Sequence, residues 1–159
     1  MKAPRVVAAV VLALLGLLVL TSCVLGGDGA ADPGPSPTYD PVPDAQLFDR
    51  VARLDGVRSA DLDYVDTFAN PNSYGGTITV DSGAKHVERI VDQACAILRQ
   101  GHPDASIVLD VALPDSSTVS TVAYDVAFPE DLEKRYGPQP GTGQVPDDAP
   151  PLTKVPGVP

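Results

Sequence analysis

Cysteine, histidine and tryptophan are scarce in this chain of 159 residues, which has two cysteines, two histidines and no tryptophan. Disulfide-dependent secreted domains of this size normally carry four or more cysteines, so a disulfide framework is excluded. Neither His86 nor His102 has a cysteine or a second histidine at the spacing of metal ligands. We therefore expect both histidines to be solvated and to bind no metal. Cys95, which lies among apolar residues of a predicted helix, is interpreted as a small buried hydrophobe.

Basic side chains are also in the minority, because 11 lysines and arginines face 21 aspartates and glutamates, for a net charge of −10. Two of the basic residues, Lys2 and Arg5, precede the first cysteine, Cys23, so the chain is more acidic beyond that point. Proteins bind nucleic acids through lysine and arginine contacts to phosphates, and an acidic chain repels them. Nucleic-acid binding is therefore excluded, and attraction to an anionic lipid surface is disfavoured for the same reason.

Sequence motifs of catalysis are lacking as well. No serine lies in a Gly-x-Ser-x-Gly turn, and no glycine-rich loop has the spacing that cradles a phosphate. Gly75 and Gly76 fall inside a predicted strand, not between a strand and a helix. The sequence therefore predicts no enzyme and no cofactor.

The first 22 residues have the order of a secretory signal peptide. Lys2 and Arg5 form a positive start, residues 6–20 are uncharged and apolar, and small residues follow at Thr21 and Ser22. Fifteen residues in a helix reach about 22 Å, which is less than the roughly 30 Å of a hydrocarbon core. The run is therefore short for a membrane span and is expected to be removed.

The end of this leader, Leu20-Thr21-Ser22-Cys23, resembles the lipobox of bacterial lipoproteins. In that family an aliphatic residue and two small residues precede a cysteine, which receives a diacylglycerol and becomes the new N-terminus after cleavage. The resemblance covers only residues 1–23. It implies that Cys23 is the site of lipidation and that its acyl chains hold the protein in the lipid bilayer, on the extracytoplasmic side of the cell membrane.

An uncleaved membrane anchor is the alternative for the leader. With residues 21–25 added, the apolar segment reaches about 20 residues, which is long enough to span a bilayer. Lys2 and Arg5 favour the cytoplasmic side under this interpretation too. Both interpretations therefore place the rest of the chain outside the cytoplasm.

The remaining chain divides into a linker, one domain and a tail. Residues 23–43 are rich in glycine and proline and are expected to form a lipid-anchored linker. Residues 44–128 carry the only sustained hydrophobic periodicity, and residues 129–136 permit a short helix that starts at a proline. Residues 137–159 contain seven prolines and few large apolar side chains, so we expect disorder.

Within residues 44–128, helical and alternating patterns follow one another in the order α-β-β-α-β-β. Asp44 is expected to cap a first helix that ends at Gly56, and Ser82 to cap a second that ends at Gly101. Residues 58–64 and 74–81 alternate as strands after the first helix, and residues 107–113 and 122–128 alternate after the second.

This order predicts an α+β fold of two layers. We expect a four-stranded antiparallel sheet with both helices on one face, which is a permuted ferredoxin-like arrangement. The pattern also resembles the helix-hairpin modules of BON and ring-building domains in bacterial envelope proteins. That resemblance rests on topology and implies no site residues.

Several aspartates are expected on the sheet face away from the helices: Asp61, Asp63, Asp81, Asp110 and Asp125. An ordinary solvated face is the simplest interpretation of this set. The alternatives are a docking surface for a basic partner and a site for a hard cation such as Ca²⁺, although the spacing does not match a calcium-binding loop.

A turn-rich loop at residues 66–73 is the other candidate for binding. It has polar and aromatic groups at Asp66, Phe68, Asn70 and Asn72, and Tyr74 follows it. The competing and favoured interpretation is that Phe68 tucks under the hairpin while the asparagines satisfy turn geometry.

Taken together, these features predict a membrane-anchored extracytoplasmic lipoprotein. We expect its domain to be a non-enzymatic interaction module that engages another envelope protein or a cell-wall component. The alternative is a module that binds a small solute or Ca²⁺ through the acidic face or through residues 66–73.

Overall fold

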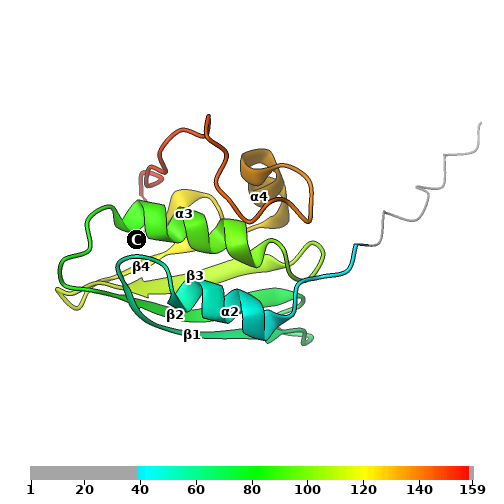
Figure 1. The fold of residues 1–159 in the computed structure, drawn as a ribbon, viewed down its shortest axis with the longest axis horizontal. Coiled ribbons are helices and arrows are strands. Elements are labelled where there is room, and N and C mark those ends of the chain that lie inside the picture. Colours follow the sequence, from blue (N-terminus) through cyan, green and yellow to red (C-terminus); the bar gives the residue numbers. More distant parts are fainter. Residues whose placement is uncertain (1–38, 158–159) are drawn as a thin grey trace, which may run out of the picture. The chain divides into compact units, whose positions relative to one another are not determined.

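The computed structural model describes residues 39–157, and the predicted signal peptide, lipidation site and most of the linker lie outside this range. The described elements confirm an α+β fold (Figure 1). In chain order they are α2 (Asp44–Ala52), β1 (Val57–Val65), β2 (Ser73–Val80), α3 (Val87–Leu98), β3 (Ser106–Ala112), β4 (Thr118–Ser120), the 3₁₀ helix η1 (Thr121–Tyr124) and α4 (Pro129–Tyr136). None of the helices in residues 39–157 combines the length and the apolar character that crossing a bilayer requires.

The strands form one sheet in the order β1-β2-β3-β4, and the sheet is mixed. The outer pairs are antiparallel, whereas β2 and β3 are parallel, with Tyr74 opposite Ile107 and Ile78 opposite Val111. The expected all-antiparallel sheet is therefore wrong at its centre, and the permuted ferredoxin-like arrangement is not confirmed. The physical reason is α3, which carries the chain back across the sheet so that β3 can lie beside β2 in the same direction.

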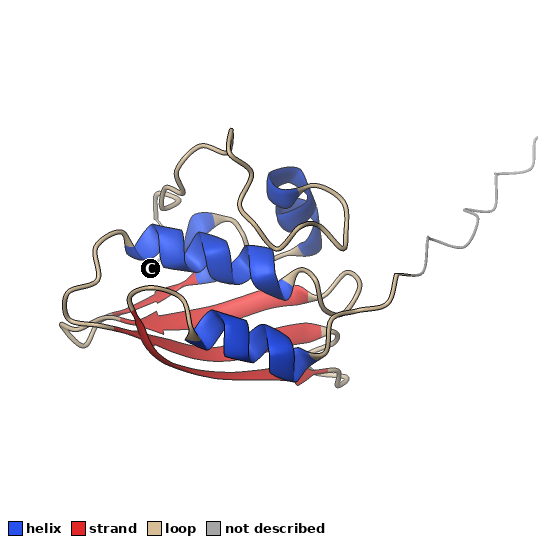
Figure 2. Cartoon of the chain, viewed as in Figure 1, coloured by secondary structure: helices blue, strands red, loops and turns tan. Residues whose placement is uncertain are grey.

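Both α2 and α3 pack on the same face of the sheet, as predicted, and no helix covers the other face in the described part of the chain (Figure 2). The core lies between these layers. Leu47 and Val51 of α2 and Val91 and Leu98 of α3 are fully buried against inward side chains of β2 and β3. Cys95 is fully buried in the same cluster, which confirms its interpretation as a small core residue.

The fourth strand is shorter than predicted and lies earlier in the chain. Residues 122–128 alternate in polarity, but β4 ends at Ser120 and the chain turns into η1. The Oγ1 atom of Thr121, which is fully buried, accepts a hydrogen bond from the Leu109 backbone N–H at 3.1 Å and donates one to the Ile107 carbonyl at 2.7 Å. The Thr121 side chain thus replaces the ladder hydrogen bonds that a longer strand would make. The chain then turns at Asp125, which has left-handed backbone geometry with φ of 58°.

Both predicted helix caps differ from the structure. Pro43 occupies the cap position of α2, and Asp44 instead accepts a hydrogen bond from the buried Tyr74 hydroxyl at 2.8 Å. The second helix begins at Val87, five residues after Ser82, and its cap residue His86 has left-handed backbone geometry with φ of 66°. Residues 82–86 therefore form a turn before α3.

The C-terminal segment, residues 137–157, follows a defined path over α3, in contrast with the disorder expected for residues 137–159 (Figure 1). The predicted short helix is confirmed as α4, and Arg135 in it forms a nearly buried ion pair with Asp92 of α3. The Arg135 side chain also donates to the Pro150 carbonyl at 2.9 Å, and the Gln93 side chain donates to the Gly143 carbonyl. Leu152 joins the hydrophobic core. Leu152, the partly buried Val145 and a few hydrogen bonds to backbone carbonyls thus hold a proline-rich segment that composition alone assigns to disorder.

Candidate functional site

The open face of the sheet carries three of the predicted aspartates. Asp61 on β1 and Asp110 on β3 lie in one row across the sheet, because both are in register with Thr77 of β2. Asp63 lies on the same face two residues further along β1, and all three are exposed. Strands are spaced about 4.8 Å apart, so the β1 and β3 carboxylates arise from backbone positions separated by about 10 Å. They project into solvent and do not converge on a shared ion.

Asp81 and Asp125 are not strand residues, so their predicted place on the open face of the sheet is wrong. Asp81 follows the last residue of β2 and lies 3.5 Å from the Arg58 guanidinium in an exposed ion pair. Asp125 is not on a strand at all, because the chain turns into η1 before it. In residues 39–157, no group of three or more histidine, cysteine, aspartate or glutamate side chains is arranged to hold a metal ion.

Strand β1 forms one edge of the sheet and is paired on one side only (Figure 1). Within the described chain, residues 58–65 make no backbone hydrogen bond outside their pairing with β2. The apolar side chains that β1 turns towards the helices, Ala60, Leu62 and Tyr64, are only partly buried, whereas Tyr74 and Ile78 of β2 are almost fully buried. The edge therefore exposes both backbone groups and part of the apolar layer.

The loop after β1 presents an exposed aromatic side chain. Phe68 is fully exposed, so the expectation that it tucks under the hairpin is wrong. The asparagines do satisfy turn geometry: the Asn70 carbonyl accepts from the Thr67 backbone N–H, and the Asn72 N–H donates to the Asp66 carboxylate at 3.1 Å. This hydrogen-bonded turn holds the Phe68 side chain away from the core.

Tyr74 is not part of that binding loop but the centre of a buried hydrogen-bonded cluster. Its hydroxyl donates to Asp44 at 2.8 Å and accepts from the His102 backbone N–H at 3.0 Å. Burial, first of all, raises the pKa of Tyr74 above its usual range, so the phenol stays protonated. The close packing of the Tyr74 ring also explains Gly101, where a β-carbon would collide with the hydroxyl.

His102 belongs to the same cluster and is not simply solvated, as the sequence had suggested. Its imidazole stacks on the Tyr64 ring with centroids 3.7 Å apart, and its Nε2 lies 3.5 Å from the Asp44 carboxylate. Periodicity gave no signal for this contact, because 38 positions separate Tyr64 from His102. The arrangement ties the start of α2, the β1–β2 hairpin and the turn before β3 together.

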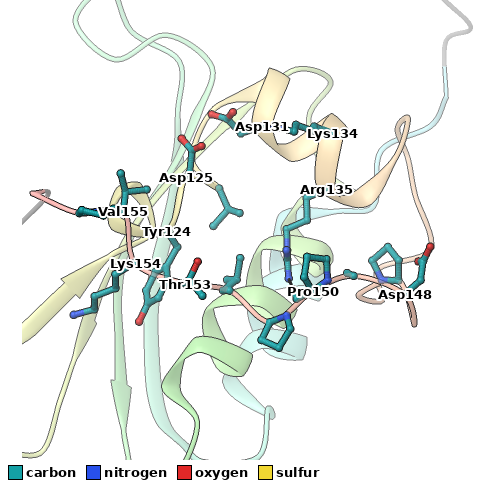
Figure 3. Close-up of a pocket in the computed structure, with 16 residues that line it drawn as sticks. Tyr124, Asp125, Asp131, Lys134, Arg135, Asp148, Pro150, Thr153, Lys154 and Val155 are labelled. Atoms are coloured by element: carbon teal, nitrogen blue, oxygen red, sulfur yellow. Dashed lines mark hydrogen bonds between the residues drawn. The ribbon is translucent and has the colours of Figure 1, made fainter.

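A cavity of about 590 Å³ lies between η1, α4 and the C-terminal segment (Figure 3). Asp125 and Asp131 lie at one end of it, and burial, followed by the nearby Asp125 charge, raises the pKa of Asp131. The Arg135 side chain reaches into the middle, but its guanidinium is already committed to Asp92 and to the Pro150 carbonyl. The cavity thus presents two neighbouring carboxylates at one end of a proline-lined hollow.

Sequence reasoning overlooked one spacing that is associated with serine nucleophiles, Ser82-x-x-Lys85. In penicillin-binding enzymes a Ser-x-x-Lys sequence provides the serine nucleophile. Here both residues are exposed and lie before the first residue of α3, so the helix does not hold their side chains together. A second cavity, of about 660 Å³, adjoins this turn and is lined by Lys85 and His86.

The Cys95 thiol is buried and is not placed to act as a nucleophile. Its sulfur lies 3.6 Å from the Val126 carbonyl, and burial raises the pKa of the thiol far above its usual range. The neutral thiol is a poor nucleophile, so Cys95 acts in packing.

Comparisons with known proteins do not add to this picture. No protein-family model, curated protein or solved structure matches the chain.

Proposed function

We propose that the chain is a lipoprotein of the bacterial cell envelope, held at the extracytoplasmic side of the membrane by acyl chains on Cys23. Its leader has the charged start, the short apolar run and the Leu20-Thr21-Ser22-Cys23 sequence that resembles a lipobox. Two acyl chains on one cysteine give durable attachment, whereas one chain gives only marginal binding. The domain of residues 39–157 is then displayed at the membrane surface.

The domain serves as a non-enzymatic interaction module for another envelope protein or a cell-wall component. The observation that supports this role is the uncovered sheet, which has one exposed face and one nine-residue edge at β1. The buried polar side chains of the described domain, such as Thr121 and Asp92, are engaged in structural hydrogen bonds. The exposed sheet, and not a group of buried polar side chains, is therefore the feature that is available to a partner.

Mass spectrometry of the protein from a membrane fraction tests the placement. We expect the mature chain to begin at Cys23 and to carry acyl mass on it. The Cys23→Ala variant is expected to lose this modification and to leave the membrane fraction after cleavage or to remain as an unprocessed precursor. An intact Met1 in the wild-type protein, with no acyl mass on Cys23, contradicts the proposal and supports the uncleaved anchor.

Binding of a small solute in the cavity beside α4 is the second candidate function. It is favoured by the cavity of about 590 Å³ and by the two carboxylates at its end. A ligand that binds only the folded state raises the melting temperature. A rise with millimolar Ca²⁺ or a small cationic amine that the Asp131→Asn variant loses would support this candidate, and an unchanged melting temperature would remove it for those probes.

A further inference from the structure

We propose that the β1 edge accepts an extended segment of a partner protein as a fifth strand, and that this segment alternates apolar and basic side chains. The inference rests on the proposed function and specifies the partner chemistry of the interaction module. Three features of the described edge carry it: the unpaired backbone of β1, the incomplete burial of its inward side chains, and the charge of its outward side chains.

The backbone of β1 provides the main attachment. A nine-residue strand is about 30 Å long, and about four of its residues direct their N–H and C=O groups away from β2. Apart from the Val57 N–H, which donates to the Leu54 carbonyl at 3.0 Å, no described residue satisfies these groups through a backbone hydrogen bond. Extended peptides bind to such edges by continuing the hydrogen-bonded ladder.

The two faces of β1 specify alternate side chains of the incoming strand. On the helix side, Ala60, Leu62 and Tyr64 are partly exposed beside Phe48 of α2, which is also only partly buried. Apolar side chains in an added strand would cover this layer. On the open side, Asp61 and Asp63 have no ion-pair partner in the described chain, so lysine or arginine opposite them is favoured.

The same charges disfavour a second copy of this chain as the occupant. The antiparallel register that pairs all nine residues of β1 with another β1 is centred on Asp61. It places the Asp61 carboxylate opposite its own copy, and like charges in directly opposite positions are destabilising. Charge complementarity therefore points to a basic strand from a different protein.

Peptide binding to the full chain, purified in neutral detergent, tests the proposal. The probe is a fluorescein-labelled nine-residue peptide of alternating lysine and valine, and its control has the same composition with the lysines grouped at one end. We expect the alternating peptide to bind and the grouped peptide to bind at least about tenfold more weakly, because only the alternating peptide matches both faces of the strand. Fluorescence anisotropy gives both affinities.

A matched pair of variants locates the binding site. The double variant Asp61→Asn, Asp63→Asn is expected to weaken binding about three- to tenfold, as the loss of two cross-strand charge pairs implies. The control Asp147→Asn, Asp148→Asn removes the same charge from the C-terminal segment and is expected to change binding less than about twofold. Amide exchange is expected to slow at alternate residues of β1 when the alternating peptide is bound.

The proposal is overturned if neither peptide binds at millimolar concentration, if both bind equally, or if both double variants weaken binding equally. It is also overturned if β1 amides are protected by self-association without peptide, because the occupant is then a second copy. These outcomes are independent of lipidation: if the wild-type chain carries no acyl mass on Cys23 but still binds the alternating peptide, the lipid anchor is refuted and the fifth-strand proposal stands.

Discussion

The two edges of the sheet are built differently. The β4 side of the sheet is closed along β3, because β4 pairs with Asp110, Val111 and Ala112 and Thr121 takes over the ladder bonds of Ile107 and Leu109 beyond them. The Val155 backbone N–H also bonds to the Ala123 carbonyl at 2.8 Å, so the tail seals η1. The β1 edge has nine residues and no such cover in the described chain. An unprotected sheet edge is a hazard for aggregation. The difference indicates that the β4 side is covered by other segments, whereas the β1 edge is protected by its charged side chains.

The largest effect is expected from the ion pair behind the closed edge. Replacing Arg135 by methionine leaves the nearly buried Asp92 carboxylate without its cation, and we expect a loss of about 3 kcal/mol in the free energy of unfolding. The same replacement of Arg53, whose pair with Asp49 is exposed, is expected to cost less than about 0.5 kcal/mol. Denaturant titration compares the two variants. Equal losses of unfolding free energy in the two variants would mean that the ion pair between α4 and α3 does not stabilise this side of the domain.

A smaller loss of stability is expected when the Thr121 hydroxyl, which replaces ladder hydrogen bonds beside β3, is removed. Thr121→Val removes the hydroxyl and leaves the Leu109 N–H and the Ile107 carbonyl without this partner, at a cost of about 2 kcal/mol. Thr121→Ser keeps the hydroxyl and is expected to cost about 1 kcal/mol or less. Unfolding by denaturant measures both, and a valine variant as stable as the serine variant would show that the hydroxyl does not hold this edge.

The open edge is expected to tolerate substitution. Asp61→Asn together with Asp63→Asn should change the free energy of unfolding by no more than about 0.5 kcal/mol, because both side chains are exposed and unpaired in the described domain. Weak self-association is expected to increase, since the like-charge repulsion between two β1 strands is gone. Denaturant titration and sedimentation at several concentrations measure the two effects. A destabilisation above 1 kcal/mol would mean that these carboxylates hold the fold.

The smallest effect is expected at the turn that leads into β4. The Ser117 side chain and backbone N–H donate to Asp115, and these hydrogen bonds lower the pKa of its carboxyl. A lowered pKa in the folded state gives stability that is present at neutral pH and is lost as pH falls through the folded pKa. Asp115→Ala is therefore expected to be slightly less stable than the wild type at pH 7 and equal to it in strong acid. A difference that persists in acid would assign the effect to backbone propensity.

The sequence predicted the elements that follow simple periods. Alternation located β1, β2 and β3 and placed Asp61, Asp63 and Asp110 on the open face, because the side-chain period of a strand does not depend on its neighbours. It could not tell which strands pair, so the parallel contact of β2 with β3 was missed. Residues 122–128 alternate in polarity without forming a strand, because the Thr121 side chain makes the hydrogen bonds to β3 that a strand there would make.

Contacts between distant segments escaped sequence reasoning for a different reason. The stacking of His102 on Tyr64 and the core position of Leu152 depend on how the chain returns to itself, which no local pattern records. Composition predicted disorder for residues 137–159 because they contain seven prolines and few large apolar side chains, yet Pro150 needs only its carbonyl to accept from Arg135. The exposure of Phe68 likewise follows from the hydrogen-bonded turn around it.

Residue-resolved amide exchange of the full chain in neutral detergent tests the contrast between the edges most directly. Alternate amides along β1 are expected to exchange rapidly, while the Leu109 and Ile107 amides, bonded to Thr121 and to the Ala127 carbonyl, exchange slowly. Slow exchange at every β1 amide of the monomeric chain would contradict the account, because the edge offered to a partner would already be covered.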